Sequence, residues 1–113
     1  MTTSAQGKGD RGERDLVAQL RALGLVDADR AYGAGRFDDR GDVDGLPGIV
    51  GQCKWYADGW RAVREAVDGA QACVEVQRLD AWPVGFVRYP RKPRWLWVMT
   101  LEDGVAMYRA ASE

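Results

Sequence analysis

The residues best suited to chemistry in this chain are three carboxylates, one amide and one ammonium, placed where the neighbouring pattern is apolar. Glu13 precedes Leu16 by three residues and Val17 by four, so its carboxylate shares the apolar face of an expected helix. Asp42 and Asp44 stand within an expected strand, where strand propensity disfavours acids. Because a buried acid requires a partner or a metal, these positions are candidates for an ion pair or a cation site.

Gln52 and Lys54 alternate with Cys53 on the next expected strand, so the amide and the ammonium should project from one face and the thiol from the other. Each feature also has a structural interpretation. Glu13 is the third residue after Asp10, where a glutamate closes a capping box. Gln52 and Lys54 could be solvent-facing polar residues of an edge strand, with Lys54 preventing edge-to-edge pairing.

The composition excludes several kinds of active site. The 113 residues contain no histidine, which removes Ser-His-Asp and Cys-His nucleophiles, histidine-ligated zinc and nucleases with a histidine base. Sixteen basic against 17 acidic residues leave no bulk positive charge, so an anionic partner must meet a local basic patch. Cys53 and Cys73 form no CxxC pair and are expected to be small buried hydrophobes in a reducing compartment.

The chain is expected to form one domain over residues 10–113, after a flexible N-terminal tail over residues 1–9. Without a candidate membrane span or signal peptide, we expect a cytoplasmic protein, in the host-cell cytoplasm if phage-encoded. The pattern predicts a helix from an Asp10 cap to a Gly24 stop, a β-hairpin around Pro47-Gly48 and a second amphipathic helix. The predicted element order is αβββαββα, with these expected ranges for the later elements: strands at 25–32, 42–46, 49–55, 82–89 and 95–100, and helices at 60–79 and from a Thr100 cap to about 110.

The ordered set of motifs resembles the PD-(D/E)XK nuclease superfamily, and within it the small Holliday junction resolvases of archaea and their phage-borne relatives. The resemblance covers about residues 9–55 and is carried by these stretches: Glu13-Arg14-Asp15-Leu16, Gly33-Ala34-Gly35-Arg36, Gly41-Asp42-Val43 and Gln52-Cys53-Lys54. It implies an α/β, restriction-endonuclease-like fold with a mixed central sheet flanked by helices. It also implies a Mg²⁺-dependent endonuclease of DNA recombination and repair, for which Mn²⁺ would substitute.

Position by position, the resemblance implies that Glu13, Asp42 and Gln52 surround the metal ion, while Lys54 lies beside the attacking water. Arg14 would reach a phosphate. Gln52 departs from the family pattern, which usually has an acid there; its amide oxygen can ligate Mg²⁺ but carries no charge, so we expect weaker metal binding. Asp42 and Asp44 share a strand face, and the Gly-Asp-Val match favours Asp42. A two-residue hairpin would pair position 42 with 53 and place Asp42 opposite Gln52 and Lys54, so the site requires an offset.

The expected partner is branched or four-way DNA, bound without a nucleotide cofactor or a membrane. Residues 81–101 contain only basic charges, and further arginines lie near the loop at 33–41, so the candidate phosphate contacts are Arg14, Arg30, Arg36, Arg40, Arg91, Lys92 and Arg94. Two symmetric cuts in a four-way junction favour a homodimer, which would also cover part of the five tryptophans. The alternatives are a less selective nuclease of the same fold and a non-catalytic DNA-binding module with a degenerate site.

Overall fold

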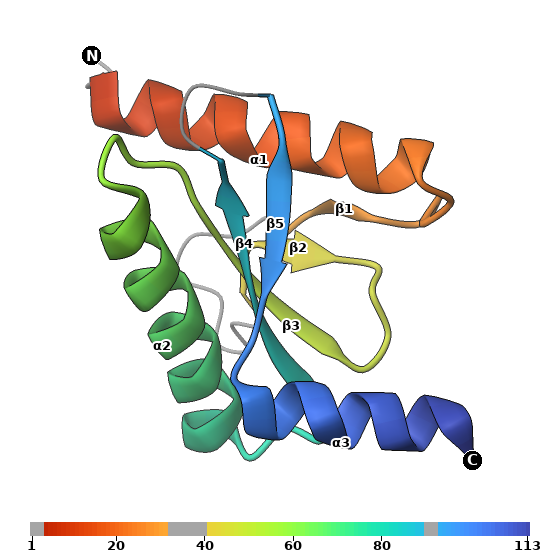
Figure 1. Cartoon of the computed structure of the whole chain (residues 1–113). Coiled ribbons are helices and arrows are strands. Elements are labelled where there is room, and N and C mark those ends of the chain that lie inside the picture. Colours follow the sequence, from red (N-terminus) through yellow and green to blue (C-terminus); the bar gives the residue numbers. More distant parts are fainter. Residues whose placement is uncertain (1–3, 32–40, 90–92) are drawn as a thin grey trace.

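The computed structural model describes residues 4–31, 41–89 and 93–113, and for residues 4–10 the backbone alone. Over these ranges the chain forms three helices and five strands, whose order is the predicted αβββαββα (Figure 1). The elements are α1 (Ser4–Ala22), β1 (Asp29–Arg30), β2 (Val43–Asp44), β3 (Ile49–Lys54), α2 (Gly59–Gln77), β4 (Trp82–Arg88), β5 (Trp95–Val98) and α3 (Leu101–Ser112). The described residues therefore form a mixed α/β globule.

α1 begins earlier than predicted and ends where predicted. Its backbone is helical from Ser4, so residues 4–9 of the expected tail belong to the helix and Asp10 is not its N-cap. Good helix formers such as Ala5 and Gln6 allow the helix to extend past the Asp-x-x-Glu pattern. At the other end Gly24 has φ +106°, and its N–H donates to Arg21 O while that of Leu25 donates to Leu20 O. These paired bonds form a Schellman motif.

The predicted hairpin between β2 and β3 is wrong. β2 pairs antiparallel with β1, and the contact of this segment with β3 is an isolated parallel bridge between Gly41 and Gly51. The predicted type II turn is present, because Ile49 N donates to Leu46 O over 3.0 Å and Gly48 has φ +79°. Gly45, also at positive φ, lies against the backbone of Asp27 so closely that a Cβ would collide with it. This approach directs β2 toward β1.

β3, β4 and β5 form a mixed sheet, in which β4 pairs parallel with β3 and antiparallel with β5. α2 makes the long crossover that parallel neighbours require. β4 lies between its two partners and is buried over residues 83–87. β5 is less enclosed than β4, since its Trp97 is 45% exposed.

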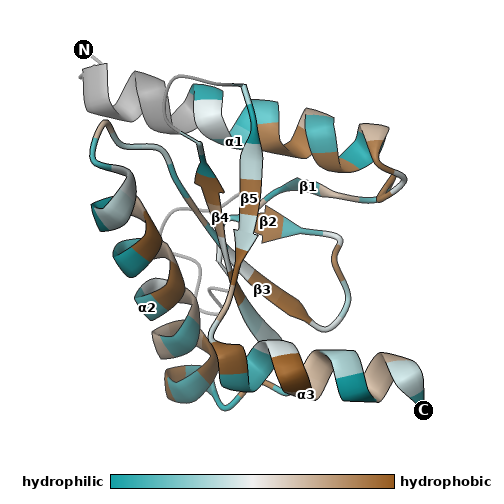
Figure 2. Ribbon diagram, viewed as in Figure 1, coloured by the Kyte–Doolittle hydropathy of each residue, from teal (hydrophilic) through white to brown (hydrophobic). Residues whose placement is uncertain are grey.

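α1 and α2 cover opposite faces of this sheet. Leu16 and Leu20 of α1 pack in one cluster with Phe86, whereas Ala62 and Ala66 of α2 pack in another with Val87. Alanines let α2 approach closely, and a Cβ on Gly85 of β4 would collide with Ala66. In Figure 2 the hydrophobic residues of α2 lie on the side turned toward the sheet.

Both later helices begin at capping residues. Asp58 caps α2 by accepting the Arg61 N–H over 3.1 Å. Thr100 caps α3, as predicted from the sequence, by accepting the Asp103 N–H over 3.1 Å. α3 has no buried residue, in contrast to α2. None of the helices in the described ranges is long and apolar enough to span a membrane.

Candidate active site

The C-terminal half of β3 presents its polar side chains on the α2 face, and the alternation predicted from the sequence is confirmed. In the parallel register Gln52 lies beside Gly85 and Lys54 beside Val87. Val87 belongs to the cluster that α2 covers, and Gln52 packs over Gly69 of α2, where a Cβ would lie 3.4 Å from Gln52 Cγ. Gln52 and Lys54 therefore share one face.

The thiol of Cys53 lies on the other face. Cys53 pairs with Phe86 and packs against the cluster that contains Leu16 and Leu20 of α1. Burial raises the pKa of this thiol well above its ordinary range, and the carboxylates of Asp42 and Glu13 raise it further. The thiol is therefore protonated at neutral pH, in agreement with its expected role as a small buried hydrophobe.

Asp42 is held against the edge of β3 by two backbone contacts. Its N–H donates to Gly51 O over 2.7 Å, and its carboxylate Oδ2 accepts the N–H of Cys53 over 2.8 Å. The two-residue hairpin that would have paired position 42 with position 53 is absent from the described segment, since the bridge joins Gly41 to Gly51. The Asp42 carboxylate thus lies at the backbone of the residue between Gln52 and Lys54.

Glu13 faces the fold, as its place on the helical stripe predicted, but its capping-box interpretation is wrong because α1 begins at Ser4. Arg30 of β1 donates from Nε and from Nη2 to Glu13 Oε2, over 3.2 and 3.1 Å. The two side chains are only 23% and 21% exposed, so each charge offsets the desolvation of the other. Arg30, which was predicted from the sequence to contact a DNA phosphate, instead pairs with Glu13.

Three of the four predicted catalytic residues, namely Asp42, Gln52 and Lys54, thus adjoin the backbone of Cys53, and the four are divided between the faces of the sheet. Glu13 approaches from the α1 face with the thiol, whereas Gln52 and Lys54 project toward α2. Asp42 lies at the strand edge between them. Asp44, the alternative acid, is two residues further along β2 and lines a different part of the molecule.

The oxygen donors suit a hard divalent cation in their chemistry, since they are carboxylates and an amide. Among the residues with described side chains, however, no group of three or more cysteines and acids is arranged to hold a metal ion. Glu13 also has Arg30 as a partner. Asp42, whose carboxylate lies at the backbone of Cys53, is the acid that a cation site including the neutral oxygen of Gln52 would use.

The predicted phosphate contacts are described only in part. Arg14 and Arg94 are exposed, and the Arg94 guanidinium lies 5.8 Å from the Tyr89 ring centroid. Arg36, Arg40, Arg91 and Lys92 lie outside the described residues. Arg88, another basic residue of the C-terminal region, packs against neighbouring side chains. Its guanidinium lies 4.0 Å from the Trp55 ring centroid, and its Nη1 lies 3.9 Å from Asp15 Oδ2.

Asp15 connects α1 to the sheet, a role that the sequence pattern does not reveal. Its Oδ2 accepts the indole N–H of Trp95 over 2.7 Å and the amide of Gln19 over 3.3 Å, in addition to the Arg88 contact. These bonds join α1 to β4 and β5 next to Trp55, which packs against Gly12. Asp15 could have been noticed as a second acid beside Glu13, but its strongest contact is with Trp95, 80 residues away in sequence, and that contact gives no local signal.

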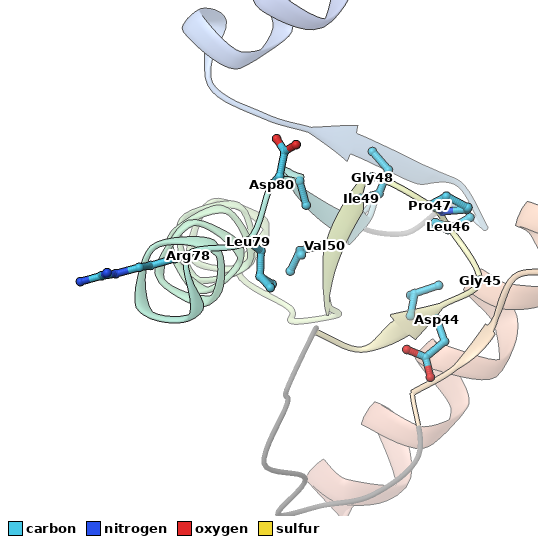
Figure 3. Close-up of a pocket in the computed structure, with 12 residues that line it drawn as sticks. Asp44, Gly45, Leu46, Pro47, Gly48, Ile49, Val50, Arg78, Leu79 and Asp80 are labelled. Carbon is cyan, nitrogen blue, oxygen red and sulfur yellow. The ribbon is translucent and has the colours of Figure 1, made fainter.

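A cavity of about 600 Å³ lies at the opposite end of β3 from Gln52 and Lys54. It is formed by the β2–β3 connection and the segment after α2, and is lined by residues 43–50 and 78–81. Figure 3 shows Val50 and Leu79 at its centre and the Arg78 side chain pointing outward. The cavity contains none of the four predicted catalytic residues, so it lends no support to their assignment.

Comparison with protein-family models, with curated proteins and with solved structures finds no match to this chain. The functional assignment therefore rests on the residues and their arrangement.

Proposed function

We propose that this chain is a metal-dependent endonuclease of the PD-(D/E)XK class that hydrolyses DNA phosphodiesters, with four-way or branched DNA as its substrate. The observation that carries the proposal is the hydrogen bond from Cys53 N to the Asp42 carboxylate over 2.8 Å. It brings an acid from a separate segment to the residue between Gln52 and Lys54. An acid beside a polar-x-lysine strand is the pattern that the sequence resemblance implies.

The arrangement of elements also supports this class. A helix precedes three strands, and a helical crossover then joins the parallel pair β3 and β4. This is compatible with a restriction-endonuclease-like core, in which the acidic strand and the lysine strand are neighbours. The three-stranded mixed sheet has a helix on each face, and we propose that this arrangement is a restriction-endonuclease-like fold.

A bound Mg²⁺ or Mn²⁺ would lower the pKa of a water ligand and polarise the phosphoryl oxygen. Asp42 and Gln52 would hold the ion, and Glu13 would join them only after exchanging Arg30 for it. Lys54 would orient the attacking water or offset the charge that develops on the phosphate. Arg14 and Arg94 are exposed and would contact flanking phosphates.

The test is cleavage of labelled four-way, duplex and single-stranded DNA in Mg²⁺, in Mn²⁺ and in EDTA. We expect paired nicks near the centre of the four-way junction, only with a metal ion. Equal cutting of all substrates would support nuclease activity and contradict a preference for four-way junctions. Binding of DNA without cleavage under every condition would reject the nuclease.

A non-catalytic DNA-binding module is the second candidate, and one observation favours it. Glu13 is engaged by Arg30 and the strand acid is replaced by Gln52, so one carboxylate of the predicted metal set is already paired with an arginine and another position carries no charge. For this candidate, Asp42→Asn and Lys54→Ala would leave DNA affinity unchanged, and no cleavage would be detected.

A further inference from the structure

Trp60 is the most exposed of the five tryptophans, and neither the core nor the proposed mechanism uses its ring. It is 70% exposed, compared with 45% for Trp97, while the other three are partly buried. The residue lies in the first turn of α2, and a short connection joins it to Lys54 at the end of β3 (Figure 1). Because single exposed apolar side chains are common on protein surfaces, the neighbours of Trp60 decide whether its ring has a ligand.

Two exposed arginines, Arg61 and Arg64, accompany this ring on α2. Arg64 follows Trp60 by four residues, so both side chains lie on one side of the helix, away from the buried alanines that pack on the sheet. The Arg61 guanidinium lies 4.8 Å from the Tyr56 ring centroid, and its Nε donates to Glu65 Oε1 over 3.4 Å. The surface formed by Tyr56, Trp60, Arg61 and Arg64 therefore combines flat side chains with positive charge.

The charges of α2 are distributed in a way that helix stability does not explain. Both of its basic residues lie in the first half of the helix, and the first turn contains no acid. Cations near a helix N-terminus are disfavoured by the helix dipole. An anionic partner would instead be attracted by this arrangement, and guanidinium groups are well suited to phosphate. The surface is thus complementary to a ligand that carries phosphates and also has a flat face for the indole.

We propose that Trp60 stacks on an unpaired base of DNA, while Arg64 and Arg61 contact the phosphates beside it. Aromatic rings and guanidinium planes are the groups on which the bases of single strands stack. In a duplex the base faces are already stacked and the edges alone are accessible, so the base must be unpaired. The choice of DNA rests on the proposed function. Within that function, the surface specifies branched DNA with a single-stranded arm, which leads away from the Asp42 and Lys54 end of β3.

Binding of two labelled oligonucleotides tests the proposal by fluorescence anisotropy, in EDTA and at low salt. One is oligothymidine of about 12 nucleotides, and the other has the same backbone without bases. Wild type should bind oligothymidine more tightly than the abasic strand. Trp60→Leu should weaken oligothymidine binding by about 5- to 50-fold and abasic binding by less than about twofold, and Trp60→Phe should retain most of the difference. Arg64→Gln should weaken both strands equally, because it removes a phosphate contact.

Trp97→Leu is the matched control, since Trp97 is the next most exposed tryptophan and contacts Phe86 on the α1 face of the sheet. It should leave both affinities unchanged in protein that circular dichroism shows to be folded. Equal binding of the two strands by wild type, or equal weakening of both by Trp60→Leu, would overturn the proposal. Failure to bind either strand would also overturn it and would favour a protein contact for the exposed ring.

The same experiment separates this proposal from the proposed function, because no cleavage occurs in EDTA for a metal-dependent nuclease. Base-dependent binding that Trp60→Leu abolishes, in a protein that cuts no DNA with any metal ion, would support the stacking surface and reject the nuclease. Metal-dependent cleavage by a protein whose binding does not depend on Trp60 would support the nuclease and reject the stacking surface.

Discussion

At the scale of single residues, the Cys53 thiol is enclosed beside two carboxylates. Burial, Asp42 and Glu13 all raise its pKa in the folded protein, in that order. An unfolded chain would ionise the same thiol near pH 8.5. As the pH rises past this value, the thiol loses its proton in the unfolded chain before it does so in the folded protein. The contribution of the buried thiol to stability is therefore complete below about pH 8.5 and is lost as the pH rises further.

The pH dependence of unfolding measures this effect. Between pH 7 and 8 the Cys53 thiol should contribute almost no pH dependence to the unfolding free energy of wild type. Above about pH 9 it should fall by up to about 1.4 kcal/mol per pH unit more steeply than in Cys53→Ala. Parallel slopes in urea denaturation of the two proteins would show that the thiol ionises normally in the folded state.

The Glu13–Arg30 pair is the second residue-scale prediction. Both side chains are largely buried, and Arg30 donates two hydrogen bonds to one oxygen. Glu13→Gln should therefore cost about 1–3 kcal/mol of unfolding free energy, because it removes a negative charge that accepts two hydrogen bonds from the guanidinium. Asp29→Asn is the control, since Asp29 and Arg21 are each about half exposed, and it should cost under about 0.5 kcal/mol. Similar losses in both variants would contradict the assignment.

The sequence predicts some of these residues well and others not at all. Strict strand alternation gives the faces of Gln52, Cys53 and Lys54, and helical spacing gives the inward direction of Glu13. The Arg30 partner of Glu13 comes from a strand 17 residues away and follows no local pattern. It is a product of the tertiary fold, which is why Arg30 was expected to contact DNA.

At the scale of the elements, local signals predict the ends of helices better than the pairing of strands. Thr100 and Gly24 act within one turn, so their capping roles could be predicted from neighbouring residues. The partner of β2 depends on the close approach of Gly45 to the backbone of Asp27. That contact joins segments 18 residues apart, and the apparent hairpin around Pro47 concealed it.

Two glycines in the β2–β3 connection provide the element-scale test. Gly45 and Gly48 both have positive φ, but only Gly45 is packed against another backbone; the Gly48 Cβ position is open. Gly48→Ala should cost about 1–2 kcal/mol from its left-handed conformation alone. Gly45→Ala should cost clearly more, because β2 must also move away from β1. Equal losses in thermal or urea unfolding would contradict the proposed role of Gly45.

At the scale of the whole molecule, α3 leaves an apolar row uncovered. Leu101, Val105 and Tyr108 are 83%, 48% and 73% exposed, and their spacing places them on one helix face. The homodimer expected from the sequence stays a prediction, and this face is where we expect it to form.

Light scattering during size exclusion tests the dimer. Wild type should have about twice the 12.5 kDa chain mass at micromolar concentration, and Val105→Asp should return it to the mass of one chain. Ala106→Asp, an exposed position on the opposite side of α3, should keep the wild-type mass. A single-chain mass for wild type would reject the dimer.

The most direct measurement of the proposed site compares single-turnover cleavage of a four-way junction by Asp42→Asn and Asp44→Asn. Each variant removes one carboxylate, and the two positions are two residues apart in sequence. Of the two acids, Asp42 is the one whose carboxylate accepts the N–H of Cys53, between Gln52 and Lys54. Asp42→Asn should lose at least about 100-fold in rate in Mg²⁺, and Asp44→Asn should remain within about threefold of wild type. Cleavage by Asp42→Asn at the wild-type rate would contradict the assignment of the active site to this edge of β3.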